Sequence, residues 1–204
     1  LALASTTEFK YDKSGNLVED KNHKYEYDEF NQLRRILDPT GKPLEEYWYN
    51  DQGQRIKKVK YNEDGTQETT YYIGKGFQRT ISAEGTKDTA YVYLGGQLVA
   101  KKENGEVSYY HPDNLGSTSL VTDPEGEGVE KTSYLPFGGV DEGGLESERL
   151  YTGKELDSTG MVYFGARYYS PELAKFIQPD TIQPDIYDPQ QLNRYAYARN
   201  NPYK

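Results

Sequence analysis

The chain has 204 residues, a formal net charge of -9, two histidines and no cysteine. The acidic balance and the lack of a basic cluster argue against nucleic-acid binding, because phosphates require neutralising cations. No apolar run approaches the length of a membrane span, and without cysteine there are neither disulfides nor thiol chemistry. Only 34% of the residues are hydrophobic, but 21 are tyrosines. The core is therefore expected to be built largely from tyrosine rings.

The first half of the chain repeats a pattern in which an aromatic residue and a Tyr-Asp pair precede a turn. This pattern occurs with the same spacing in Phe9–Gly15 and Tyr25–Asn31, and less closely in Tyr47–Gly53 and Val59–Gly65. Glycine and asparagine both tolerate a left-handed backbone, which predicts a hairpin corner at their shared position. The preceding Asp can accept hydrogen bonds from the turn backbone. The residues of this motif are Tyr11, Asp12, Gly15, Tyr27, Asp28 and Asn31.

Repeated hairpins of this kind cannot each bury a face alone, so they are expected to stack with their neighbours. The predicted fold is mainly β: a curled strip of antiparallel β-hairpins with one or two short helices near the C-terminus. Residues 1–122 are assigned to the strip and residues 123–204 to a separate core segment, because acidic, glycine-rich loops mark the change. A second helix is predicted to start at Asp188, since Leu192, Tyr195 and Arg199 follow at helical spacing.

The stretch Tyr151–Asp180, called the core block below, is the densest group of apolar and aromatic residues. Met161–Tyr169 is predicted as a strand, with Gly165 marking a bulge or a close backbone approach. Ser170–Glu172 has the composition of a helix start and predicts a short helix over Leu173–Ile177. The core block is expected to sit inward and to plug one end of the curled sheet.

Three segments carry a family resemblance. Residues 153–180, GKELDSTGMVYFGARYYSPELAKFIQPD, resemble the core segment that closes RHS/YD-repeat proteins. Residues 110–118 resemble the YHxDxLGS motif of that family, residues 134–138 resemble its YxPFG motif, and the N-terminal repeats resemble its YD repeats. Ala174–Ile177 departs from the usual GRFL, and Gln178 replaces a small residue. The matching motif residues are His111, Asp113, Leu115, Gly116, Pro136, Phe137, Gly138, Gly153, Lys154, Glu155, Gly165, Arg167, Tyr168 and Tyr169.

The resemblance implies a hollow shell wound from a hairpin strip, like the YD shells of teneurins and of Tc-toxin C components. Such a shell segment encloses a C-terminal effector domain and keeps it inactive until delivery. It also implies a secreted or cell-surface bacterial protein that cleaves itself just beyond the end of this chain. The rival hypothesis is an extracellular adhesion module that binds glycans or a partner protein. Exposed rows of tyrosine would favour the module, and interlocked tyrosines would favour the shell.

The resemblance places Asp180 at an acidic position associated with aspartyl-type self-cleavage, with Arg167 or Arg194 as charge partner. Two carboxylates that share a proton can drive such hydrolysis. The second carboxylate is expected beyond Lys204, so the chain itself is predicted not to be an enzyme. The alternative for Asp180 is a capped loop residue between two prolines.

No metal or cofactor site is predicted, because His23 and His111 are far apart and lack a defined third ligand. His111 is expected to support the turn that follows it. Lys154 and Glu155 are open to a catalytic pairing, but a structural role is favoured, with Lys154 covering an aromatic face.

The first strand, around Thr7–Tyr11, is expected to leave an unpaired sheet edge that recruits another strand. The predicted partner is an upstream part of the same protein or a second copy of the chain, although Lys10, Asp12 and Lys13 partly protect the edge. Because relatives continue further, the chain is expected to be either a recombinant segment or a natural product trimmed near Lys204.

Overall fold

The computed structural model describes residues 8–144 and 147–203. Within these residues the fold is mainly β, as predicted, and the helical content consists of two short 3-10 turns. The strands of the largest sheet are β1 (Lys10–Tyr11), β2 (Leu17–Glu19), β3 (Lys24–Tyr27), β4 (Leu33–Leu37), β5 (Pro43–Tyr49), β6 (Arg55–Tyr61), β7 (Gln67–Ile73), β8 (Phe77–Ser82), β9 (Gly85–Leu94), β10 (Gln97–Glu103), β11 (Glu106–Pro112), β12 (Thr118–Thr122) and β13 (Gly128–Lys131). The remaining elements are β14 (Ser133–Tyr134), β15 (Val140–Glu142), η1 (Tyr151–Gly153), β16 (Glu155–Leu156), β17 (Val162–Tyr163), β18 (Tyr168–Ser170), β19 (Lys175–Phe176) and η2 (Ala198–Asn200).

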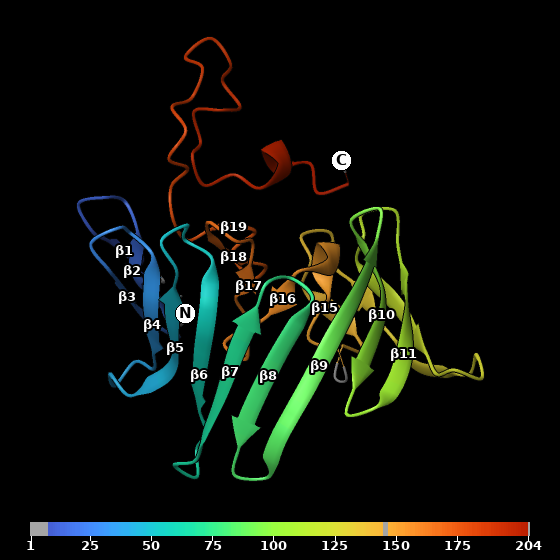
Figure 1. Ribbon diagram of the computed structural model, residues 1–204. Coiled ribbons are helices and arrows are strands. Elements are labelled where there is room, and N and C mark those ends of the chain that lie inside the picture. Colours follow the sequence, from blue (N-terminus) through green and yellow to red (C-terminus); the bar gives the residue numbers. More distant parts are fainter. Residues whose placement is uncertain (1–7, 145–146, 204) are drawn as a thin grey trace, which may run out of the picture.

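The largest sheet, called the strip, has its strands in sequence order from β1 to β13, each antiparallel to the next. Figure 1 shows that the strip curves around the orange core block without closing on itself. The predicted curled strip of hairpins is therefore confirmed. The strip runs on through β13, past residue 122, and the division of the chain at that residue remains a prediction.

The hairpin corners of the strip have the predicted chemistry. In the first, Oδ1 of Asp12 accepts hydrogen bonds from the backbone N–H groups of Ser14 and Asn16, at 2.9 and 2.8 Å, and Gly15 has a φ of 86°. In the second, Asp28 caps the turn in the same way and Asn31 has a φ of 59°. The turn therefore needs a side-chain acceptor at its start and a residue that tolerates positive φ at its corner.

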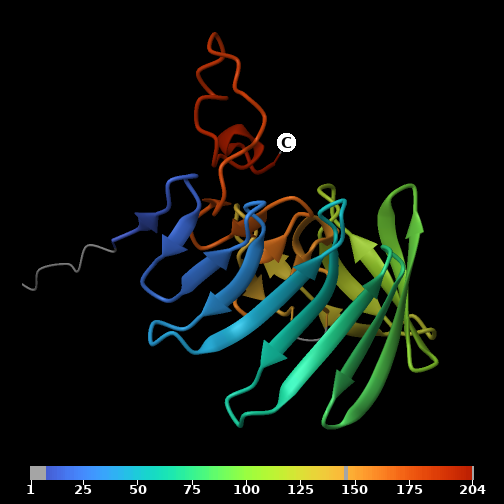
Figure 2. The same cartoon turned by 60° about the vertical axis from the view of Figure 1, so that its left-hand side comes forward.

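The core block forms the four-stranded sheet β16-β17-β18-β19 and lies against the concave face of the strip (Figures 1 and 2). The single strand predicted over Met161–Tyr169 is wrong, because β17 and β18 are two antiparallel strands joined by a tight turn. The N–H of Phe164 donates to the carbonyl of Arg167 at 3.0 Å across this turn. Gly165 supplies a φ of 92°, and a Cβ there would meet nothing within 4 Å. Its role is to allow this backbone conformation, so neither a bulge nor a close approach explains it.

The predicted helix over Leu173–Ile177 is also wrong. Ser170 accepts the N–H of Leu173 at 3.2 Å, as a helix N-cap does, but the chain turns at Ala174 with a φ of 54° and continues as β19. Pairing of β19 with β18 buries Phe176 and Ile177. Burial against the block and the strip therefore overrides the local helix signal.

Part of the segment after Asp180 projects away from both sheets in the two views (Figures 1 and 2), and the chain then returns to the core block, where Ala196 bridges Lys175 and the ring of Tyr197 packs on Tyr169. The helix predicted from Asp188 is wrong, because Asp185 and Asp188 instead accept the turn N–H groups of Tyr187 and Gln190. Such side-chain acceptors compete with helix formation. In the part of the chain that the structure describes, no helix is long and apolar enough to cross a membrane.

Tyrosine rings form much of the core, as the composition suggests. Tyr47 and Tyr168 lie 5.1 Å apart between strip and core block, packed with Leu17, Leu33 and Ile36. A second group surrounds Tyr169 and includes Phe164, Phe176, Tyr151 and Tyr197 in edge-on or tilted contacts. A third, smaller group of Tyr91, Leu98, Tyr110 and Val121 lies on the strip.

Candidate functional site

The structure brings together the three residues that the sequence singled out for self-cleavage. Asp180 follows β19, Arg167 lies in the turn between β17 and β18, and Arg194 comes from the C-terminal segment. Nη2 of Arg167 lies 2.9 Å from Oδ2 of Asp180. Nε of Arg194 donates to the backbone carbonyl of Asp180 at 2.8 Å, and the N–H of Asp180 returns a bond to the carbonyl of Arg194 at 2.9 Å. These residues are called the Asp180 cluster below.

The Asp180 cluster is fixed but still open to solvent. The guanidinium of Arg167 stacks 3.8 Å from the ring centre of Phe176, and burial lowers its pKa despite the opposing charge of Asp180. The side chain of Asp180 is 37% exposed. Within residues 8–144 and 147–203, no hydrogen bond joins Asp180 to a second carboxylate. The cluster therefore supplies one positioned carboxylate rather than a pair.

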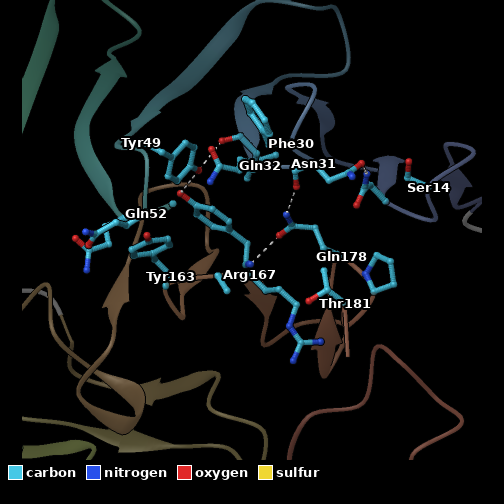
Figure 3. A pocket seen from close by; sticks show the side chains of 18 of the residues that line it. Ser14, Phe30, Asn31, Gln32, Tyr49, Gln52, Tyr163, Arg167, Gln178 and Thr181 are labelled. Atoms are coloured by element: carbon cyan, nitrogen blue, oxygen red, sulfur yellow. Dashed lines mark hydrogen bonds between the residues drawn. The ribbon is translucent and has the colours of Figure 1, made fainter. Parts of the chain in front are cut away.

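A hollow of about 560 Å³ lies beside the cluster (Figure 3). Its walls come from the first strip turns, at Ser14, Asn31 and Gln52, and from the β17–β18 turn at Arg167. Gln178 connects the two sides: its Nε2 donates to the carbonyl of Asn31 at 2.8 Å, and its Oε1 accepts the N–H of Tyr168 at 3.0 Å. The residue that departs from the family pattern thus ties the core block to a YD turn.

A second site lies where the core block meets the strip, and the sequence did not predict it. Arg55 and Lys58 of β6 face Glu155 and Asp157 of the block, and all four side chains are largely or fully buried. Arg55 lies 2.7 Å from Glu155 and 2.6 Å from Asp157. Lys58 lies 2.8 Å from Glu155 and 2.7 Å from Asp157. These four residues are called the ionic junction below.

The carboxylates of the ionic junction respond differently to burial. Burial raises the pKa of Glu155, but the cations Arg55, Lys58 and Arg149 outweigh it and hold that pKa well below the usual value of a glutamate. Burial raises the pKa of Asp157. The cations Arg55 and Lys58 lower this pKa only in part, and the negative charges of Glu45 and Glu155 raise it further. The junction consequently depends on both of its cations.

Glu45 of β5 holds the turn that follows Asp157. Its carboxylate accepts hydrogen bonds from Oγ of Ser158 at 2.8 Å, from Oγ1 of Thr159 at 2.9 Å and from the hydroxyl of Tyr47 at 2.6 Å. The side chain is fully buried, and these donors satisfy its oxygens. The strip therefore holds the Asp157–Gly160 turn by hydrogen bonds as well as by packing.

The other motif segments also meet in space. Asp113 caps the turn at Leu115 and Ser117, and Gly116 has a φ of 83°. His111 contacts Thr122 at 3.0 Å, so it joins two strands instead of supporting the following turn. The hydroxyl of Tyr169 donates to the carbonyl of Phe137 at 2.8 Å.

Close packing explains one of the motif glycines. A Cβ at Gly138 would lie 2.3 Å from the ring of Tyr151, whereas a Cβ at Gly153 would lie 3.3 Å from the carbonyl of Gly116. Lys154 lies 5.7 Å from the ring centre of Phe164 and so covers an aromatic face. Glu155 binds the strip and does not pair with Lys154. In the described part of the chain, no group of three His, Cys, Asp or Glu side chains is arranged to hold a metal ion.

A strip of sequential hairpins with capped YD turns, curved around an aromatic block, defines the class of RHS/YD-shell proteins. Residues 2–203 match the model of the teneurin YD-shell family, and the chain belongs to this family.

Two relatives illustrate the similarity in sequence. The tRNA3(Ser)-specific nuclease WapA of Bacillus spizizenii is 28% identical over 212 residues, covering 99% of this chain and 9% of that protein. Toxin subunit YenC1 of Yersinia entomophaga is 33% identical over 109 residues, covering 48% of this chain and 10% of that protein.

The crystal structure of TcdB2-TccC3 has the same fold, with a TM-score of 0.80 and 22% identity over 94% of this chain and 10% of that one. The matched regions make up about a tenth of the length of each of these proteins.

Proposed function

We propose that this chain is a wall segment of a shell that encloses the C-terminal effector domain of a longer protein. The observation that carries the proposal is the strip itself. Within the described residues, each strand of the strip pairs in the sheet with its neighbours in sequence, and the strip curves around the block that follows it, which gives the wall an inside and an outside. Toxin names among the relatives support an effector as the enclosed domain, and a secreted or cell-surface location fits the same relatives.

The tyrosines favour the shell over the adhesion module. Rings such as Tyr47, Tyr168 and Tyr169 are interlocked between strip and core block. The strongly exposed tyrosines of the described residues lie on separate elements: Tyr11, Tyr71, Tyr109, Tyr187 and Tyr203. Rings scattered in this way do not form the continuous row that stacking on a glycan chain requires.

Self-cleavage is the second part of the proposal. Asp180 supplies one carboxylate of an aspartyl pair, and Arg167 and Arg194 fix its position. In an aspartyl pair, one of the two carboxylates accepts a proton from the attacking water. The second carboxylate comes from the sequence beyond Lys204.

The test uses the longer protein that contains this segment and a downstream domain. Asp180→Asn is expected to leave the chain uncut, because it removes the charge but keeps the size, while the wild type yields two fragments on a denaturing gel. Asp185→Asn, in the same C-terminal segment, is the matched control and should be cut normally. Cleavage by the Asp180→Asn protein would contradict the role of Asp180.

Enclosure of the downstream domain is tested separately, by its resistance to proteolysis. The downstream domain should resist an added protease as long as the shell is intact, and it should become sensitive when the shell is unfolded. A downstream domain that is digested at the same rate in the native protein and alone would contradict enclosure.

A further inference from the structure

Gln178 is two residues before Asp180 and ties the chain at that point to both sheets. Its side chain is 4% exposed. Nε2 donates to the carbonyl of Asn31 at the corner of the second YD turn, and Oε1 accepts the N–H of Tyr168 on β18 (Figure 3). Both ends of the amide are therefore in use. The small residue that the family pattern has at this position is too short to span the two partners.

The residues on either side of this glutamine are also held by the strip. The carbonyl of Ile177 accepts the N–H of Leu17 at 2.9 Å. Pro179 lies against the first YD turn, since a Cβ at Gly15 would be 3.4 Å from its ring. The first two YD turns thus form the surface on which the chain rests as it leaves β19.

The two YD turns are joined to each other at the same place. Nδ2 of Asn16 donates to Oδ1 of Asn31 at 3.0 Å and to Oδ2 of Asp12 at 2.9 Å. Asn16 is 1% exposed, so this chain of amides is buried, as Gln178 is. A buried polar group that loses its partner is costly, because it has already given up its contact with water. The amides consequently hold one another in place.

The position of Gln178 is passed on to Asp180 through few rotatable bonds. The ring of Pro179 fixes its own φ at about −65° and confines the residue before it to extended ψ values. The N–H of Asp180 is bound as well, to the carbonyl of Arg194 at 2.9 Å. A shift of Gln178 would therefore move the carboxylate of Asp180.

The contact of Asp180 with Arg167 is more open to water. The side chain of Arg167 is 21% exposed and that of Asp180 is 37% exposed. Water and salt weaken an ion pair with this access to solvent. The buried amide of Gln178 supplies a support with which water does not compete.

We propose that Gln178 is a positioning residue for self-cleavage, which holds the strand that carries Asp180 in the orientation that cleavage requires. The inference rests on the proposed function, because it assumes that Asp180 is one of the two carboxylates that cut the chain. Gln178 acts through the backbone of Asp180, since its own amide is occupied by Asn31 and Tyr168. Misplacing a catalytic group by about 1 Å can cost on the order of 10²-fold in rate, so loss of this support should slow cleavage strongly.

The test uses the longer protein that contains this segment and a downstream domain, with cleavage followed over time on a denaturing gel. Gln178→Met keeps the length of the side chain but removes both hydrogen bonds, and it should slow cleavage by at least about tenfold. Gln183→Met, at an exposed position of the same segment, is the matched control and should be cut at the wild-type rate. Near-UV circular dichroism checks that each variant is folded. If Gln178→Met does not fold, Gln178→Asn, which keeps the amide on a shorter side chain, takes its place.

Gln178→Glu separates positioning from a general loss of stability. Its carboxyl group can accept the N–H of Tyr168 at any pH, but it can donate to the carbonyl of Asn31 only when it is protonated. Its cleavage rate relative to the wild type should be low at neutral pH and should rise as the pH falls toward the ordinary pKa of a glutamate. Burial raises that pKa and moves the rise to higher pH. The relative rate of Gln178→Met should not change with pH, because methionine does not titrate.

A wild-type cleavage rate in Gln178→Met would overturn the proposal, and so would a relative rate of Gln178→Glu that stays constant with pH. Asp180→Asn in the same assay separates this inference from the proposed function. If Asp180→Asn stays uncut while Gln178→Met is cut at the wild-type rate, only the positioning role fails. If Asp180→Asn is cut, the proposed role of Asp180 fails, and the positioning role fails with it.

Discussion

Replacing Arg55 by Met tests whether charge, and not only shape, holds the core block on the strip. Arg55 is 1% exposed and lies within 2.7 Å of both Glu155 and Asp157. Its guanidinium also lies 4.4 Å from the ring centre of Tyr163 and 4.9 Å from that of Tyr72. Met fills a similar volume but leaves two buried carboxylates with Lys58 as their nearest remaining cation.

Removing one partner of a buried ion pair costs about 3–5 kcal/mol, and Lys58 should keep the loss near the lower end. A loss of about 3 kcal/mol corresponds to a fall in melting temperature of roughly 6–12 °C for a chain of this size. Urea denaturation followed by tyrosine near-UV circular dichroism measures it. Arg79→Met is the matched control: Arg79 pairs with Asp88 on the surface, and its side chain is 50% exposed, so its loss should cost less than about 1 kcal/mol.

The double variant Arg55→Met/Asp157→Asn supplies the decisive comparison. Because it removes one negative charge together with the positive one, it should be more stable than the sum of its single changes by at least about 1 kcal/mol. A loss below about 1 kcal/mol for Arg55→Met, or strict additivity in the double variant, would refute the reasoning and leave apolar packing as the force that seats the block.

Three further predictions follow from single contacts. Gly138→Ala should cost more than about 2 kcal/mol in chemical denaturation, because its Cβ would strike the ring of Tyr151 at a positive φ, whereas Gly41→Ala has free space and should cost about 1 kcal/mol; equal losses would contradict this. Asp28→Ala should cost about 1 kcal/mol by removing the cap of a YD turn, and an unchanged urea midpoint would show that the cap is dispensable. The fold should lose stability as the pH falls below 4.5, the ordinary pKa of a glutamate, because the pKa of Glu155 is lower in the folded state and its ionised form stabilises the fold. Glu155→Gln should weaken this dependence of stability on pH below 4.5. An unchanged dependence in the variant would contradict the role of Glu155.

Local signals predicted the strip well. The Asp at the start of each turn and the Gly or Asn at its corner act within five residues, so the turns at Gly15 and Asn31 could be read from the sequence. In the core block, local signals of the same kind gave wrong predictions. Ser170 does accept a helix-type N–H bond, but burial of Phe176 in a β-pair decides the structure that follows.

The two candidate sites also differ in whether the sequence predicted them. The resemblance pointed to Asp180, Arg167 and Arg194, and the structure brings them into contact. The ionic junction joins residues about a hundred positions apart, and nothing in the spacing of Arg55 or Lys58 pairs them with Glu155. Long-range charge pairing depends on the docking of whole sheets, which one sequence does not reveal.

The order of the strands has a consequence for how the molecule forms. Every strip strand pairs with the strand made just before it, so the strip can grow hairpin by hairpin as the chain emerges from the ribosome, with short loop closures at each step. The core block is synthesised after the strip, and its contacts reach back about a hundred residues to Arg55. Its carboxylates meet both cations only when β6 is in its native register, because a slip of one residue turns Lys58 to the other face. The core block therefore docks fully only on a strip in its native register, and a strip assembled out of register would stay open to unfolding and proteolysis.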